Sequence, residues 1–183
     1  DTEGEVVYLY DAESARGNKS FPFNAVRIKN PTDSVLESGP VTVFGEGKFV
    51  GEGLSVPIPA KSIAFIPFAL DRQVLVETKE DGIDKIAKIT TVQRGVFSTE
   101  VQHTRRSTLT LNNRTAEKAV VYIRHTVPEN YKLTLPADAK EKLGAAYLIK
   151  VEIEPRSKKD VIIEEATPLF KSTDIRSSVG MDM

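Results

Sequence analysis

The chain has 183 residues, 40% of them hydrophobic, and 25 Lys and Arg residues nearly balance 26 Asp and Glu residues. This apolar content is enough for a packed core, and a formal net charge of −1 gives no general attraction for nucleic acid or an anionic membrane surface. The absence of cysteine excludes disulfide bonds and thiolate metal sites. No apolar segment approaches the ~20 residues that a membrane-spanning helix needs. Because the chain begins with Asp1, we expect a processed or excised piece of a longer protein.

Short apolar or alternating segments, separated by turn residues, follow one another from the start of the chain, and this pattern is typical of an all-β protein. Gly45-Glu46-Gly47 separates two such segments and predicts a tight hairpin turn, because glycine adopts positive φ without a steric penalty. In the first half of the chain we expect strands at residues 6–10, 21–29, 41–44, 48–50, 63–68 and 74–78.

The polar segment 78–85 marks the boundary that we expect between two domains. Beyond it, the only helix candidate is residues 137–143, which Gly144 ends. Alternation of apolar and polar residues predicts further strands at residues 85–93, 97–112, 119–125, 147–154 and 161–163.

The predicted fold is therefore all-β, with two tandem antiparallel β-sandwich subdomains of the immunoglobulin-like type at residues 1–80 and 81–170. A polar C-terminal tail follows at residues 171–183. The length of the chain suits either two sandwiches of roughly 90 residues each or one large β-domain. A single continuous domain, in which residues 85–112 thread between both sheets, is the alternative.

Glycines at positions 45, 47, 51 and 53 superficially suggest a loop that cradles a phosphate group. A P-loop needs Ser or Thr directly after its Gly-Lys pair to reach magnesium, whereas Phe49 follows Lys48 in this chain. A dinucleotide-binding loop must open a helix, but residues 48–50 have strand character. We therefore interpret these glycines as turn residues.

His103 and His125 are the chain's two histidines, and they lie on different predicted strands with no metal-ligand spacing between them. We interpret them as ordinary surface or half-buried histidines. Glu152 and Glu154 share one face of a predicted strand, where paired carboxylates can perform acid–base chemistry. The simpler interpretation is a solvent-facing row of glutamates. No Gly-x-Ser-x-Gly motif is present to place a serine nucleophile.

Other motifs predict no chemistry. Residues 81–84, Asp-Gly-Ile-Asp, lack the order of an EF-hand loop and indicate a turn. The basic doublets at residues 105–106 and 158–159 have no interleaved aromatic residues, so a nucleic-acid groove is not expected. Residues 18–20 and 113–115 match the N-glycosylation pattern, which matters only in a eukaryotic secretory setting. We predict no catalytic, cofactor-binding or metal-binding residue.

One segment resembles a known family. Residues 36–44, Leu-Glu-Ser-Gly-Pro-Val-Thr-Val-Phe, and residues 47–53, Gly-Lys-Phe-Val-Gly-Glu-Gly, are similar to the "aGPvtvyrdGefvGeg" stretch of the DUF4139 family, the C-terminal region of mucoidy-inhibitor-A-like bacterial proteins. Residues 68–76 resemble that family's "lGvDrdvkV", with Ala69 in place of the usual glycine. The likeness extends at the level of pattern over residues 5–170, and the tryptophan often found late in the family is absent.

The resemblance implies properties that the residues alone do not. Longer members of the family place an N-terminal domain and a coiled-coil segment before this region, and they are commonly exported, which implies a periplasmic or extracellular location. The family has no established catalytic residues to transfer. By this resemblance Asp71 and Arg72 are expected to matter structurally, as a local turn and ion pair.

We therefore expect a non-enzymatic module of a larger exported bacterial protein of uncharacterised function, which mediates protein or glycan interaction at the cell envelope. Its edge strands are the expected binding elements, with residues 97–112 and 147–154 as candidates. One alternative is a hydrolase or carbohydrate-active enzyme that uses Asp71, Glu152, Glu154 or a histidine. The other alternative is a structural spacer. No cofactor, nucleic-acid partner or membrane span is expected.

Overall fold

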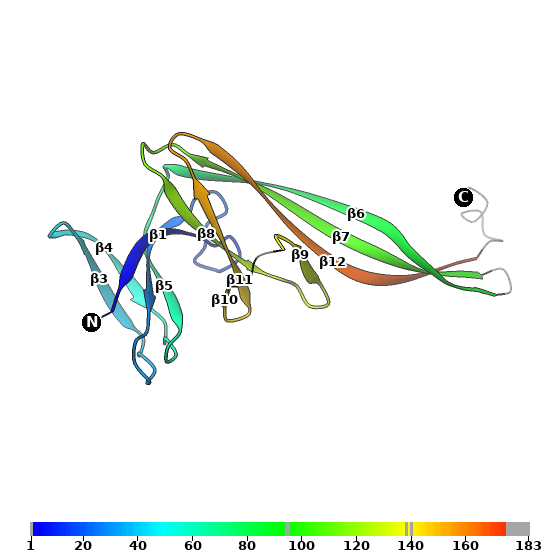
Figure 1. Ribbon diagram of the computed structural model, residues 1–183, viewed down its shortest axis with the longest axis horizontal. Coiled ribbons are helices and arrows are strands. Elements are labelled where there is room, and N and C mark those ends of the chain that lie inside the picture. The colour runs from blue at the N-terminus through cyan, green and yellow to red at the C-terminus, as the bar shows by residue number, and fades with distance from the viewer. Residues whose placement is uncertain (1, 94–95, 138, 140, 175–183) are drawn as a thin grey trace. The chain divides into compact units, whose positions relative to one another are not determined.

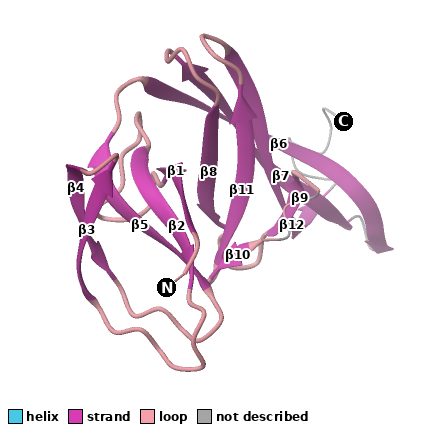
Figure 2. Ribbon diagram, turned by 60° about the vertical axis from the view of Figure 1, so that its left-hand side comes forward, coloured by secondary structure: helices cyan, strands magenta, loops and turns pink. Residues whose placement is uncertain are grey.

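The computed structural model describes residues 2–93, 96–137, 139 and 141–174, and every regular element within them is a β-strand (Figures 1 and 2). The predicted all-β class is confirmed. The helix expected at residues 137–143 is wrong at the described positions, because Pro136 and Ala137 form a bend and turn and residues 142–143 form a short strand. The described residues do not include positions 138 and 140 of that expected helix. They also do not include positions 175–183 of the expected tail.

The described residues form twelve strands. In chain order these are β1 (Gly4–Tyr10), β2 (Phe23–Lys29), β3 (Gly39–Gly45), β4 (Lys48–Ser55), β5 (Ile63–Leu70), β6 (Val74–Gln93), β7 (Val96–Asn113), β8 (Ala119–Thr126), β9 (Lys132–Leu135), β10 (Lys142–Leu143), β11 (Ala146–Ile153) and β12 (Lys158–Asp174).

The strands form three sheets, with the orders β10-β11-β8-β1-β2-β5, β6-β7-β12-β9 and β3-β4. In the six-stranded sheet, β1 pairs with β8 in parallel through Tyr8–Tyr10 and Val121–Ile123, while the other registered neighbours are antiparallel. This sheet is therefore mixed, whereas the sequence predicted purely antiparallel sheets. The finer immunoglobulin-like arrangement stays a prediction.

Contacts group the chain into two compact units, and each unit draws on three separate stretches of sequence. The first unit contains Asp1–Glu77, Leu109–Thr126 and Ala139–Val161, and the second contains Thr78–Thr108, Val127–Asp138 and Ile162–Met183. The predicted linear boundaries after residues 80 and 170 stay predictions.

The polar segment at residues 78–85 belongs to a strand, so the turn predicted for residues 81–84 is wrong. β6 continues through this segment as one element, with Asp81 and Ile83 both exposed. The local preference of Asp and Gly for turns is overridden because β6 finds backbone hydrogen-bond partners along β7.

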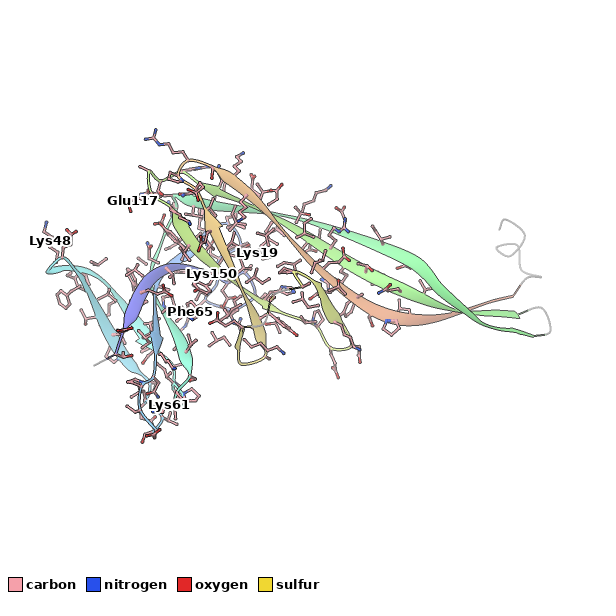
Figure 3. The ribbon with its side chains drawn as sticks, in the orientation of Figure 1. Lys19, Lys48, Lys61, Phe65, Glu117 and Lys150 are labelled. Carbon is pink, nitrogen blue, oxygen red and sulfur yellow. The ribbon has the colours of Figure 1, made fainter. Side chains whose placement is uncertain are left out.

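The core of the first unit lies on one face of the six-stranded sheet. Phe65 and Tyr122 meet edge to face with ring centroids 5.1 Å apart, and the guanidinium of Arg27 lies 5.4 Å from the centre of the Tyr122 ring. Full burial of each large apolar side chain contributes about 1.5–3 kcal/mol. The buried cluster contains Val7, Leu9, Ala25, Phe65, Tyr122 and Leu148, which come from five different strands (Figure 3 labels Phe65).

Asn113, at the end of β7, is completely inaccessible to solvent. Its side-chain nitrogen lies 2.8, 3.3 and 3.1 Å from the carbonyl oxygens of Glu117, Ile153 and Glu154. Its side-chain oxygen accepts hydrogen bonds from the backbone N–H and the hydroxyl of Thr115, at 3.0 and 2.7 Å. The triplet that matches the N-glycosylation pattern therefore forms a structural turn, in which the asparagine side chain satisfies backbone groups from separate segments.

Asn30, at the end of β2, repeats this arrangement and is also fully buried. Its side-chain nitrogen donates to the carbonyl oxygens of Ser34, Ile58 and Pro59, at 2.9, 3.1 and 3.0 Å. The backbone N–H and the hydroxyl of Thr32 donate to its side-chain oxygen. The same Asn-x-Thr turn thus occurs twice in the first unit.

A second turn accompanies each asparagine. Lys61 and Arg156 have positive φ values of 59° and 50°, and each directly precedes a serine. The carbonyl oxygens of these serines, Ser62 and Ser157, each accept the backbone N–H of one of the two buried asparagines, at 2.9 Å in both cases. The first unit therefore contains an internal structural repeat. Its loops differ in length, so no fixed period is visible in the sequence.

Replacing Asn113 with alanine leaves backbone groups without their partner in a buried place, so we expect the free energy of unfolding to fall by about 2–4 kcal/mol. Asn112→Ala is the matched control, because Asn112 precedes it in β7 and is only half-buried; we expect a change of about 0.5 kcal/mol or less. Urea-induced unfolding compares the two variants. An equal loss of stability in both would contradict the role assigned to Asn113.

The β3–β4 hairpin forms as the sequence predicted. Glu46 and Gly47 occupy its two-residue turn with φ values of 51° and 75°, as a type I′ turn requires. Lys48 marks this end of the hairpin in Figure 3. The interpretation of these glycines as turn residues is therefore confirmed for residues 45–47.

Gly51 and Gly53 lie within β4 and have a different role, which the sequence interpretation missed. A Cβ atom on Gly53 would lie 2.6 Å from the carbonyl oxygen of Pro67, and one on Gly51 would lie 2.7 Å from the Phe68 ring. Both contacts are shorter than atoms tolerate, so only glycine allows β4 to approach β5 this closely.

Gly53→Ala should force β4 away from β5, and we expect the free energy of unfolding to fall by about 1–3 kcal/mol. The amides of β4 should also exchange faster with solvent. Gly39→Ala is the matched control in the same hairpin, because a Cβ atom there meets nothing within 4 Å. Hydrogen exchange followed by mass spectrometry measures both. Equal protection of β4 in the two variants would show that the close approach does not hold this strand.

Candidate functional site

A polar pocket of about 580 Å³ lies within the first unit. β1 contributes Tyr8, β2 contributes Asn24, and the link between β5 and β6 contributes Asp71 and Gln73. The loop between β7 and β8 supplies residues 115–118, including the Glu117 side chain labelled in Figure 3. The pocket therefore gathers side chains from four places in the chain that are far apart in the sequence.

Asp71 is the most constrained polar group of this pocket. One of its carboxylate oxygens accepts the backbone N–H of Gln73 at 2.6 Å. The other accepts the side-chain amide of Asn24 at 3.2 Å and the hydroxyl of Tyr8 at 3.4 Å. The local turn expected at Asp71 is therefore present, while the ion pair expected with Arg72 stays a prediction. Three donors fix the orientation of the Asp71 carboxylate.

Tyr8 is held in its protonated form. Burial raises the pKa of its hydroxyl to about 12, and the negative charge of Asp71, the hydrogen bond to Asp71 and the charge of Glu117 act in the same direction. At neutral pH the Tyr8 hydroxyl is therefore a hydrogen-bond donor, and it is poorly suited to act as a general base or a nucleophile.

Lys118, on the rim of the pocket, connects it to the glutamates of β11. Its ammonium group lies 2.5 Å from a carboxylate oxygen of Glu152 and 3.9 Å from one of Glu154. A hydrogen bond from Lys118 and its charge lower the pKa of Glu152. Both glutamates are exposed. Glu152 therefore remains ionised, whereas a general acid at neutral pH needs a raised pKa.

The two histidines lie in different units and each has an acidic partner. His125 places Nδ1 3.1 Å from a carboxylate oxygen of Glu13, which also accepts the backbone N–H of Thr126. Burial alone would raise the pKa of Glu13, but these hydrogen bonds outweigh it and lower the pKa. In the second unit, His103 bonds through Nδ1 to Asp84. Among the described residues, no group of three or more His, Asp or Glu side chains is placed to hold a metal ion.

The basic doublets are engaged with neighbouring groups. Arg106 forms two hydrogen bonds to one carboxylate oxygen of Glu164, at 2.7 and 2.9 Å, and Arg105 lies over the ring of Tyr131 at 5.7 Å from its centre. Lys159 donates to the carbonyl oxygen of Glu152 at 3.1 Å. Arg105, Arg106 and Lys159 therefore each contact a neighbouring protein group, and the expectation of no nucleic-acid groove stays a prediction.

The β3–β4 hairpin carries an exposed apolar surface. Phe44 and Phe49 are directly opposite in the register, 65% and 64% exposed, and their rings meet edge to face at 6.3 Å. Of the thirteen large exposed hydrophobic residues in the described chain, seven lie between residues 35 and 56. We call the exposed side of the hairpin the hairpin face. It consists of Pro40, Thr42, Phe44, Phe49, Glu52 and Leu54.

An apolar groove of about 510 Å³ adjoins the hairpin face. Pro40 and Leu54 border it on the hairpin, and Phe23, Phe68 and Leu70 border it on the six-stranded sheet. The hairpin therefore presents both exposed apolar side chains and a hollow next to them. Neither feature was predicted, because alternation alone assigns one face of each strand to a core.

The sheet orders decide which strands have a free side. β7 lies between β6 and β12, so the prediction that residues 97–112 form an edge is wrong. β11 lies between β8 and the two-residue strand β10, so most of its outer side forms part of the sheet's edge. Among the described residues, β3 pairs with β4 alone, so the other side of β3 is free. Its seven residues include no charged one.

Comparison with protein-family models, with curated proteins and with solved structures gives no match. The resemblance to DUF4139 therefore stays a prediction. No helix in the described part of the chain is long and apolar enough to cross a membrane.

The proton affinity of Tyr8 tests the geometry of the pocket. We expect Tyr8 to titrate near pH 12 and Asp71→Asn to lower this pKa, because a neutral amide no longer opposes formation of the tyrosinate. Burial persists in the variant, so the pKa should stay above the ordinary value of 10.0. The chemical shift of the Tyr8 ring carbon Cζ reports the titration. Glu129→Gln, an exposed change outside the pocket, is the control, and a Tyr8 pKa that Asp71→Asn leaves unchanged would contradict the contact.

Proposed function

We propose that this chain is a non-enzymatic binding module that takes up an extended segment of a partner protein along β3. The observation that supports this most directly is the free side of β3 together with the exposed hairpin face. Exposed apolar patches on soluble domains mark interaction sites. Natural edge strands usually carry charges that block pairing with another chain, and β3 has none.

A polypeptide suits this surface better than a glycan does. The unpaired backbone groups of an edge strand match the N–H and C=O groups of an extended peptide, which adds as a further strand. Phe44 and Phe49 have no polar atom with which to hydrogen-bond sugar hydroxyls, but they can pack against apolar side chains. The partner segment is therefore expected to alternate apolar residues with the period of a strand.

The apolar groove beside the hairpin face gives this segment a place to anchor. An apolar side chain of the partner would lie between Leu54 of the hairpin and Phe68 of β5. Buried anchors of this kind supply most of the binding free energy in protein interfaces. The groove therefore favours binding over the spacer alternative, which predicts a surface without an exposed apolar patch.

The enzyme alternative has less support from the same structure. It needs carboxyl groups with pKa values suited to proton transfer, but the pKa of Glu152 is lowered and Tyr8 stays protonated. We further propose, on the resemblance to DUF4139, that the chain belongs to a larger exported bacterial protein and acts in the periplasm or outside the cell. On the alternation of its strands, we propose the immunoglobulin-like sandwich arrangement that the sequence predicts for residues 1–80 and 81–170.

A photoreactive residue in place of Thr42, on the exposed face of β3, tests the proposed function in a bacterial envelope extract. We expect a crosslink to one polypeptide, mapped by mass spectrometry to an extended segment with alternating apolar residues. Phe49→Ser should weaken capture about tenfold, because it removes an aromatic anchor from the hairpin face.

Two controls make the result decisive. The same photoreactive residue at Gln102, an exposed position of β7, should give no crosslink to that polypeptide. Ile162→Ser, which removes an exposed apolar side chain from β12, should leave capture unchanged. Equal crosslinking from positions 42 and 102, or crosslinks to lipid or glycan alone, would show that β3 does not bind a protein segment.

A further inference from the structure

The polar pocket beside Tyr8 differs in chemistry from the apolar groove. Seven of its eleven lining residues are polar or charged. Its volume of about 580 Å³ lies within the ~300–1,000 Å³ typical of small-molecule sites. All of its lining residues belong to the first unit. The pocket therefore offers a second surface for recognition, independent of the β3–β4 hairpin.

The polar groups of the pocket are arranged before any ligand binds. Asp71 has its orientation fixed by Tyr8, Asn24 and the backbone of Gln73, so little conformational entropy is lost when it accepts a further hydrogen bond. A carboxylate has about four lone-pair sites, and three donors leave capacity for another. The side chains of Gln73 and Glu117 are exposed at the same pocket and add a donor and further acceptors.

The charges of the pocket argue against an anionic ligand. Asp71 and Glu117 are acidic and Lys118 is basic, so the lining carries a formal charge of −1. The ammonium group of Lys118 already pairs with Glu152 at 2.5 Å. A phosphate or sulfate group would meet two carboxylates and one compensated cation, which is unfavourable.

The remaining features fit a ligand with many hydroxyl groups. Each hydroxyl both donates and accepts, which matches a lining that mixes carboxylates with an amide and a phenol. Val6 is 67% exposed and lies with Tyr8 at the same pocket, where they offer apolar surface to the C–H groups of a sugar ring.

We propose that this pocket binds a neutral saccharide, with Asp71 and Gln73 hydrogen-bonded to its hydroxyl groups and Val6 packed against its ring. The site does not depend on the proposed binding of a protein segment by β3. The saccharide is held by hydrogen bonds and packing, and no bond of the sugar is broken.

Titration of the ¹⁵N-labelled chain with neutral trisaccharides tests the proposal. The probes are cellotriose, maltotriose and tri-N-acetylchitotriose, with trigalacturonic acid and spermidine as charged comparisons. We expect at least one neutral trisaccharide to cause saturable shifts of the Tyr8, Gln73 and Glu117 amide signals. Trigalacturonic acid should bind more weakly, because its carboxylates meet those of the pocket.

Variants assign the binding to named residues. Gln73→Ala removes an exposed side chain but keeps the backbone N–H that Asp71 accepts, so the fold should persist while affinity falls about tenfold. Asp71→Asn keeps the shape of the side chain and should weaken binding by a similar factor. Gln102→Ala is the matched control on an exposed site outside the pocket, and Phe49→Ser should also leave saccharide binding unchanged.

The proposal is overturned if none of the three neutral trisaccharides shifts these signals in the folded chain. It is also overturned if the shifts lie elsewhere, if Gln73→Ala and Asp71→Asn bind as the unmodified chain does, or if spermidine binds more tightly than every saccharide. Because Phe49→Ser separates the two surfaces, these outcomes do not depend on whether β3 captures a protein segment.

Discussion

The side-chain amide of Asn113 has no contact with water, so every hydrogen bond it makes must come from the protein. It links the end of β7 to the carbonyl groups at the end of β11 and closes the turn that leads into β8. The next backbone N–H, that of Arg114, donates to the carbonyl oxygen of Gln73 at 3.0 Å. One wall of the polar pocket is therefore fixed to the other through the residues around Asn113. In the same way, the side-chain amide of Asn30 links the end of β2 to carbonyl groups of the segments before and after the β3–β4 hairpin.

Two glycines of the hairpin determine both what β4 packs against and what it leaves exposed. Gly51 and Gly53 allow β4 to lie directly against β5 because no Cβ atom separates the backbones. With that side of β4 covered, Phe49 and Leu54 are left on the exposed side. Gly53 and Leu54 also line the apolar groove together with Phe68. Close packing on one side of β4 and exposure on the other therefore have a common cause.

Prediction from sequence succeeded where a local rule is sufficient. The all-β class and the type I′ turn at Glu46–Gly47 follow from alternation and from the need for positive φ. The exposed state of Glu152 and Glu154 also follows from their alternation with the buried Val151 and Ile153. The candidate site is not accessible in this way. The turn at Asp71 is expected only from the family resemblance, and Tyr8, Asn24 and Lys118 carry no local motif that would connect them to it.

Most of the strands and the type I′ turn at Glu46–Gly47 can be predicted from the sequence, because they depend on the φ preferences and side-chain alternation of neighbouring residues. Contacts between distant segments are needed for residues 78–85 to continue as strand β6, for β1 to pair with β8 in parallel, and for Tyr8, Asp71 and Lys118 to meet at one pocket. Pairing between distant strands depends on the hydrogen bonds and packing that the whole sheet supplies. No local preference of the residues involved specifies such a partner.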